Sequence, residues 1–194
     1  MKKLLIMVIA LIMSASFTMS ALAETVPTAA QTQILPVATV EDLVDLEISP
    51  DVFGDPTGGA KIISAVIETS ETNPDAQYVN VFGYIYPVDP SAPNIEWRVL
   101  LPLVWNGRSV QLGGGANNGS IPGLTGVSSM GSIVPIDEGY IVYGDDSGHQ
   151  SESSMDASFA ANDEALANYT ASPHKGEYRN EIYRRGILRA GTGV

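Results

Sequence analysis

A glycine-rich loop is the first feature of this sequence that could do chemistry. Residues 113–119 (GGGANNG) directly follow a strand-like run at residues 109–112, so the loop would offer backbone N–H groups at the carboxyl end of a strand without side chains in the way. A phosphate loop is excluded because Ser120 stands where a lysine is needed, and the dinucleotide fingerprint fails at Asn118. An oxyanion hole and a tight surface turn remain as interpretations.

A second motif, residues 144–149 (GDDSGH), combines carboxylates, a hydroxyl and an imidazole. Neighbours in sequence rarely form the hydrogen-bonded chain of a catalytic triad, whose members come from separate elements. The motif also lacks the alternating acidic ligands of a calcium loop, and its single imidazole does not make a zinc site, so no metal is predicted. We therefore predict a structural role for Asp146 and His149, in hydrogen bonds that stabilise a turn. His174 is predicted to be a solvated residue at a helix start.

No serine of this chain satisfies the nucleophile-elbow pattern Gly-x-Ser-x-Gly. Ser128 and Ser129 lie between glycines that are one residue too far apart, and Ser147 has Asp145 where the first glycine belongs. The sequence therefore predicts no catalytic nucleophile within these residues.

Composition excludes several classes of protein. The 194 residues carry 22 acidic and 10 basic side chains, a formal net charge of −12, and no cysteine. Such an acidic chain is unsuited to binding nucleic acid, and without cysteine it has no thiolate metal site or redox pair. No cofactor is expected.

The first 23 residues have the three regions of a secretory signal peptide. Lys2 and Lys3 precede an apolar stretch at residues 4–15, and Ala21-Leu22-Ala23 is a small-x-small cleavage signal. The apolar stretch is too short for a membrane anchor. We expect cleavage after Ala23, a secreted or periplasmic location, and no membrane association afterwards.

The pattern of the remaining residues predicts an α/β protein, with a strand-rich amino-terminal half followed by helices. Residues 24–60 form an extended acidic lead-in with a short amphipathic turn around 40–46. Strands are expected at 62–69, 78–86 and 96–105 as antiparallel neighbours, then at 109–112 and 140–143, the last as a sheet edge. Helical spacing follows at 156–169 and 175–188.

Five sequence blocks, in this order and spacing, resemble the amino-terminal half of the tannase and feruloyl esterase family. They are residues 101–108 (LPLVWNGR), 113–120 (GGGANNGS), 139–140 (GY), 146–150 (DSGHQ), and 157–159 (ASF) with 162–165 (NDEA). The resemblance covers about residues 60–180. It assigns residues 61–194 to the amino-terminal part of an α/β-hydrolase catalytic domain.

This resemblance implies a secreted hydrolase of carboxylic esters, typically those of aromatic acids, with a Ser-His-Asp mechanism. Gly114, Gly115 and Ala116 would supply oxyanion N–H groups, while the block containing Asp146 and His149 would be a family signature. The substrate would be a small aromatic ester.

The sequence departs from the family pattern in two ways. The family's nucleophile, acid and histidine lie further along than this chain extends, so we expect a hydrolase domain cut short and inactive by itself. Ala116 and Asn117 replace residues that are often glycine and aromatic in relatives. The alternative is a non-catalytic secreted binding or structural protein that keeps the front half of the fold.

Overall fold

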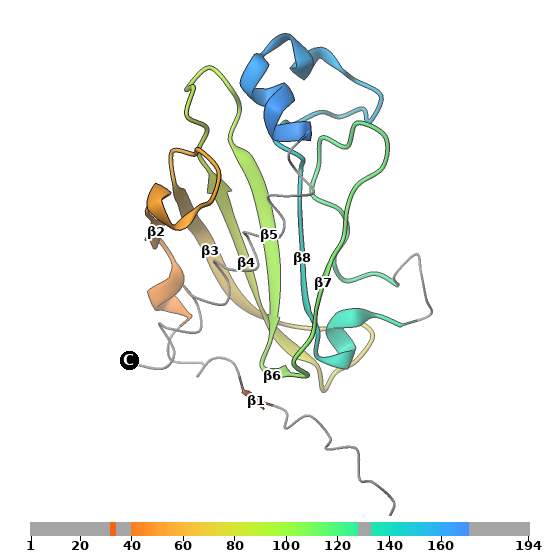
Figure 1. The fold of residues 1–194 in the computed structure, drawn as a ribbon. Helices are drawn as coiled ribbons and strands as arrows, with labels where there is room; N and C mark the ends of the chain where they lie inside the picture. The colour runs from red at the N-terminus through yellow and green to blue at the C-terminus, as the bar shows by residue number, and fades with distance from the viewer. Residues whose placement is uncertain (1–31, 34–39, 128–132, 171–194) are drawn as a thin grey trace, which may run out of the picture.

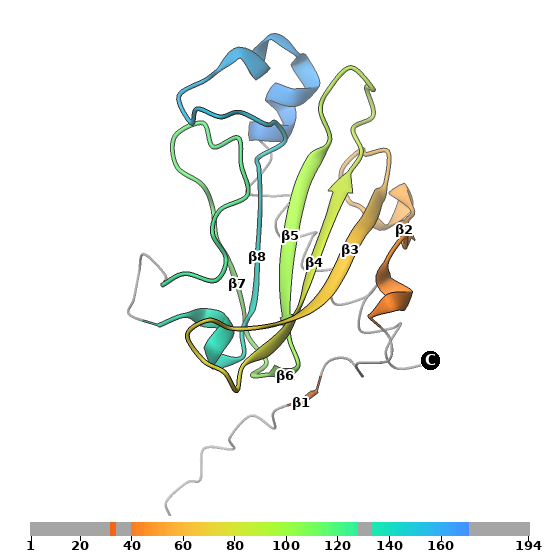
Figure 2. The ribbon, with the colours of Figure 1, turned by 180° about the vertical axis from the view of Figure 1, so that it is seen from behind.

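The computed structural model describes residues 32–33, 40–127 and 133–170. The predicted signal peptide, the helix expected at 175–188, Ser128, Ser129 and His174 lie outside these ranges. Within them, a six-stranded mixed sheet dominates and helices are few, an arrangement compatible with an α/β fold (Figure 1, Figure 2).

The six-stranded sheet has the order β2-β3-β4-β5-β8-β7. Its strands are β2 (Glu47–Ile48), β3 (Ala60–Thr69), β4 (Gln77–Ile85), β5 (Ile95–Pro102), β7 (Ser109–Gln111) and β8 (Ile141–Asp145). Neighbouring strands are antiparallel except β7 and β8, which are parallel. The predicted antiparallel arrangement of the first three long strands is confirmed. The expected strand at 96–105 divides at Leu103, and its end, β6 (Val104–Trp105), pairs with β1 (Thr32–Gln33).

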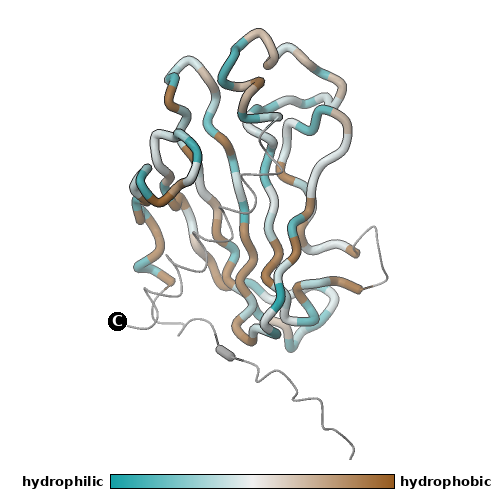
Figure 3. Tube along the Cα trace, in the orientation of Figure 1, coloured by the Kyte–Doolittle hydropathy of each residue, from teal (hydrophilic) through white to brown (hydrophobic). Residues whose placement is uncertain are grey.

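The core lies along the middle strands. Alternate residues of β4 are fully buried at Val79 and Val81, and they pack in one cluster with Trp97 and Val99 of β5. Gly83 makes room for this packing, because a Cβ there would lie 2.4 Å from the Trp97 ring. Hydrophobic segments accordingly follow the central strands in Figure 3. Each such side chain contributes about 1.5–3 kcal/mol when fully buried.

Strand β8 is not a sheet edge, and the prediction for residues 140–143 is wrong on this point. All five of its residues are buried, and β8 lies between β5 and β7. A strand buried on both faces is typical of a sheet centre, and the backbone of β8 is paired on both sides, with β5 and with β7. The edge is β7 instead.

The helical segment after β8 starts later than expected. The prediction was one helix over 156–169, whereas the structure has a 3₁₀ turn, η5 (Ser158–Ala161), followed by α-helix over residues 163–170. Asn162 separates them, because its Oδ1 accepts the N–H groups of Glu164 (3.0 Å) and Ala165 (2.9 Å) and so caps the helix.

Part of the acidic lead-in packs onto the sheet. The 3₁₀ turn η2 (Glu41–Leu43) lies in the predicted amphipathic stretch and buries Leu43, β2 pairs with β3, and a second 3₁₀ turn, η3 (Pro50–Val52), connects them. A further 3₁₀ turn, η4 (Pro135–Glu138), precedes β8.

Candidate active-site loop

Two loops meet at one end of the sheet. The glycine loop, residues 113–119, follows β7, and the loop at residues 146–157 follows β8. Because β7 and β8 are parallel neighbours, their carboxyl ends lie at the same sheet edge, where open α/β sheets bind ligands. The two segments are side by side in both views (Figure 1, Figure 2). The predicted position of the glycine loop at the carboxyl end of its strand is confirmed, and residues 113–116 are exposed as expected, whereas Asn118 and Gly119 are buried.

Three carbonyl groups of the glycine loop accept hydrogen bonds from the protein. Gly115 O accepts Asn118 N–H at 2.9 Å, Ala116 O accepts the Tyr169 hydroxyl at 3.3 Å, and Gly119 O accepts Ser151 N–H at 2.9 Å. Among the described residues, the N–H groups of Gly114, Gly115 and Ala116 have no acceptor, and all three residues are exposed. These donors are therefore available to an oxygen atom of a ligand.

The glycines of this loop differ in what the fold requires of them. A Cβ on Gly114 would lie 1.7 Å from Asn118 Oδ1, and Gly119 combines a φ of +93° with Ser151 atoms only 2.9–3.0 Å from the Cβ position. Nothing lies within 4 Å of a Cβ on Gly115. Gly114 and Gly119 are therefore structural necessities, whereas a side chain at Gly115 would project into open space above the loop.

Two other residues of the loop have a left-handed backbone. Ala116 has a φ of 53° and Asn118 a φ of 59°, conformations that cost an L-residue about 1 kcal/mol or more. Asn118 is held by its side chain, which donates to Asp145 O (3.1 Å) and Ser147 Oγ (2.9 Å). This amide joins the loop after β7 to the loop after β8.

Asp146 is buried beneath the two loops and shows the hydrogen-bond network that the sequence predicted. Its carboxylate accepts N–H groups from Glu96 (3.0 Å) and Gly148 (2.8 Å), and it also binds the side-chain amide of Gln150. Burial raises the pKa of Asp146 to about 7, although the hydrogen bonds act in the opposite direction. Asp146 thus connects β5 to the loop after β8.

His149 does not share in that network. Its side chain is buried, and neither ring nitrogen has a hydrogen-bond partner in the described part of the chain. The ring stacks on Phe159 at 3.7 Å between centroids and meets Tyr169 edge-on at 6.0 Å. Burial lowers the pKa of His149. Ring packing takes the place of the expected hydrogen bonds.

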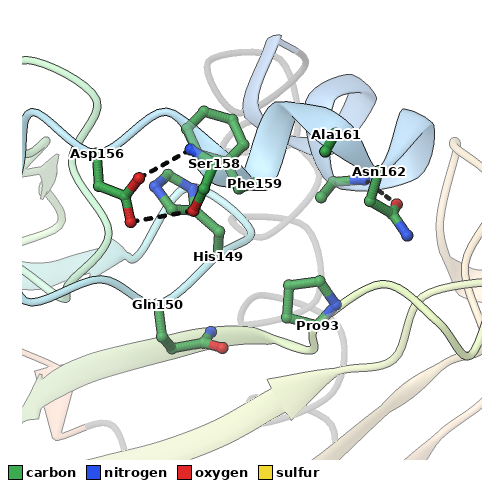
Figure 4. Close-up of a pocket in the computed structure, with 9 residues that line it drawn as sticks. Pro93, His149, Gln150, Asp156, Ser158, Phe159, Ala161 and Asn162 are labelled. Atoms are coloured by element: carbon green, nitrogen blue, oxygen red, sulfur yellow. Dashed lines mark hydrogen bonds between the residues drawn. The ribbon is translucent and has the colours of Figure 1, made fainter.

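A pocket of about 370 Å³ lies beside this ring, between the loop after β8 and the β4–β5 connection (Figure 4). Its walls include Pro93, Gln150, Phe159 and Asn162. The carboxylate of Asp156 accepts the N–H (2.8 Å) and hydroxyl (3.1 Å) of Ser158 at its rim.

No triad is assembled in residues 40–127 and 133–170. Ser147 Oγ accepts a hydrogen bond from Asn118 Nδ2, and no serine hydroxyl in these ranges is hydrogen-bonded to the His149 ring. These residues also contain no group of three or more ligating side chains that could hold a metal ion. None of their helices combines the length and apolar composition needed to cross a bilayer.

Residues 79–178 match the protein family described as "Tannase and feruloyl esterase". The chain belongs to the tannase and feruloyl esterase family. The match includes both loops at the carboxyl ends of β7 and β8. A protein described as an uncharacterized esterase from Agrobacterium fabrum is 50% identical over 119 residues, which cover 59% of this chain. The same alignment covers 22% of the relative, so this chain spans well under half of that protein's length.

Sequence reasoning missed two residues that hold the tannase-family glycine loop. Asn118 could have been found, since an Asn-Gly pair is typical of a left-handed backbone and a tight turn. Tyr169 could not, because it lies 53 residues from Ala116 and nothing in the local pattern indicates the contact.

Proposed function

We propose that this chain supplies the oxyanion-binding loop of a serine-type carboxylic ester hydrolase. The observation that carries the proposal is that the N–H groups of the exposed residues Gly114, Gly115 and Ala116 have no acceptor among the described residues. Membership of the tannase and feruloyl esterase family supports ester hydrolysis as the reaction. The parallel strands β7 and β8 support the interpretation of the sheet as the amino-terminal part of an α/β-hydrolase fold.

The loop would act on the charge that develops during acyl transfer. When a nucleophile attacks the ester carbonyl, the carbonyl oxygen becomes an oxyanion, and N–H groups already aimed at it stabilise the transition state without reorganising. The chain contains no Gly-x-Ser-x-Gly serine. Donors without a nucleophile and a proton acceptor do not cleave an ester, so the 194-residue chain by itself should not hydrolyse esters above background.

The substrate we propose is a small ester of an aromatic acid, a choice supported by the feruloyl esters named in the family description. Secretion with cleavage after Ala23 is part of the proposal, supported by the charged, apolar and small-x-small regions of residues 1–23. Amino-terminal sequencing of exported protein tests it. A mature protein that begins at residue 24 is expected, and an uncleaved amino terminus would contradict it.

The test of the loop uses a hybrid esterase, in which the aligned segment of the Agrobacterium fabrum relative is replaced by the matching residues of this chain. Gly115→Val should lower kcat by about 100-fold with little change in KM, because the branched side chain covers the N–H donors. Since a Cβ at Gly115 meets no atom within 4 Å, the fold should remain intact.

Gly123→Val is the matched control, because Gly123 also has open space around its Cβ position but lies outside the loop. Its kcat should be unchanged. Equal losses in the two variants, or a Gly115→Val loss confined to KM, would contradict the oxyanion role. A hybrid that binds methyl ferulate without hydrolysing it, while the relative hydrolyses the ester, would favour the non-catalytic binding protein.

A further inference from the structure

The short helix at residues 163–170 contacts the glycine loop through Tyr169. The Tyr169 hydroxyl donates to the carbonyl oxygen of Ala116 at 3.3 Å. The helix is itself attached to the β4–β5 connection, since the Glu164 carboxylate accepts the N–H groups of Val88 (2.6 Å) and Asp89 (2.5 Å). The hydroxyl of Tyr169 is therefore presented from an anchored element.

We propose that Tyr169 is a positioning residue, which fixes the direction of the N–H groups in the oxyanion loop; the inference rests on the proposed function. Ala116 joins two peptide planes, one carrying its own N–H and the other linking it to Asn117. The second plane is held at both ends, because Tyr169 binds Ala116 O and Asn117 N–H donates to Ser154 O at 2.8 Å. With that plane held, the two backbone angles of Ala116, of which φ is left-handed, determine where its own N–H points.

The ring of Tyr169 is located by an aromatic cluster, defined as His149, Phe159 and Tyr169. Phe159 and Tyr169 have ring centroids 5.0 Å apart, and Phe159 also stacks on His149 at 3.7 Å (Figure 4 shows the His149–Phe159 pair). His149 Nε2 also lies 3.3 Å from the Cβ position of Gly119. The cluster thus contacts the loop at Ala116 and at Gly119.

His149 takes part in this cluster through the packing of its ring. The side chain is buried, its ring stacks on Phe159, and burial lowers the pKa of the imidazole. His149 would therefore act through shape, and the hydroxyl of Tyr169 would be the group that orients the loop.

Tyr169→Phe separates positioning from packing, because it removes the hydroxyl and keeps the ring. In the hybrid esterase we expect kcat to fall about tenfold, equivalent to about 1.4 kcal/mol, with KM within about twofold and Tm unchanged. Tyr140→Phe is the matched control: its hydroxyl also has a partner, Arg108 Nη1 at 3.2 Å, but Tyr140 lies at the amino end of β8, away from the loops. It should leave kcat unchanged.

A spectroscopic measurement on the 194-residue chain accompanies the kinetics. In Tyr169→Phe the ¹³C signal of the Ala116 carbonyl should shift, because it loses a hydrogen bond, and the HN–Hα coupling of Ala116 should change with its φ. A packing role alone would leave both unchanged.

The outcomes distinguish the two proposals. If Gly115→Val lowers kcat and Tyr169→Phe does not, the positioning role is wrong and the oxyanion loop stands. If Gly115→Val has no effect, the proposed function fails. A Tyr169→Phe loss that appears in KM or Tm instead of kcat would also overturn the positioning role.

Discussion

The loops that follow β7 and β8 lie at the same end of the sheet but use their polar groups differently. Residues 113–116 are exposed, and the N–H groups of Gly114, Gly115 and Ala116 have no acceptor in the described part of the chain. In the loop after β8, Asp146 and His149 are buried. The Asp146 carboxylate accepts the N–H group of Glu96 in β5 and that of Gly148 in its own loop. The outer loop presents donors and the inner loop supports it, so changes in each should affect different properties.

The largest loss of stability should come from the inner loop. Asp146→Ala leaves the buried N–H group of Gly148 and the partly buried donors of Glu96 and Gln150 without their acceptor, and should lower the free energy of unfolding by about 3 kcal/mol. Urea denaturation measures it. Asp75→Ala, on an exposed turn, is the control, and a similar small loss in both variants would refute the supporting role of Asp146.

Disrupting the contact between the two loops should cause the next largest loss of stability. Gly119→Ala forces a side chain into a left-handed backbone and against Ser151, so we expect a loss of about 2 kcal/mol. Gly123→Ala, in open space, should change stability by less than about 0.5 kcal/mol. If the two variants have the same free energy of unfolding, Gly119 is not packed against Ser151 as proposed.

A pH effect on stability sharpens the comparison further. Burial raises the pKa of Asp146 from 3.8 to about 7, and an acid with a raised pKa stabilises the folded state when it is protonated. That contribution is complete below about pH 4 and is lost as pH rises through 7. Relative to Asp146→Asn, the unmodified chain should lose about 3 kcal/mol of stability between pH 5 and pH 8. Parallel pH curves would contradict the raised pKa.

The smallest effect on stability is expected in the outer loop. Gly115→Ala should change the free energy of unfolding by less than about 0.5 kcal/mol, because its Cβ would meet no atom within 4 Å. Thermal denaturation of the 194-residue chain measures it. A destabilisation as large as that of Gly119→Ala would mean that the fold also requires a glycine at position 115. In that case a loss of activity in Gly115→Val could not be assigned to the N–H donors.

Much of the sheet could be predicted because its strands are long and locally patterned. The β-branched and aromatic runs that became β3, β4 and β5 needed no knowledge of the rest of the chain. The position of β8 could not be predicted this way, since its place between β5 and β7 is set by pairing with residues far away in sequence. The helix start was misplaced because Phe159, which has helical spacing, packs on His149 from a 3₁₀ turn.

The candidate site was predicted where its signal is local. Seven residues with four glycines after a strand were enough to locate the loop. Its supports were not visible, because the bonds from Asn118 to Asp145 and from Tyr169 to Ala116 join distant residues. The role of His149 was missed in part, since a histidine that packs only through its ring has the same sequence pattern as one that forms hydrogen bonds.

The central place of β8 has a consequence for folding order. Strands β3, β4 and β5 form a meander whose contacts are between neighbours in sequence, whereas Asp146 meets Glu96 across 50 residues. Contacts that close a long loop cost more chain entropy and form more slowly than local ones. The meander should therefore assemble before β8 joins it, so the glycine loop would reach its final geometry among the last parts of this sheet to form.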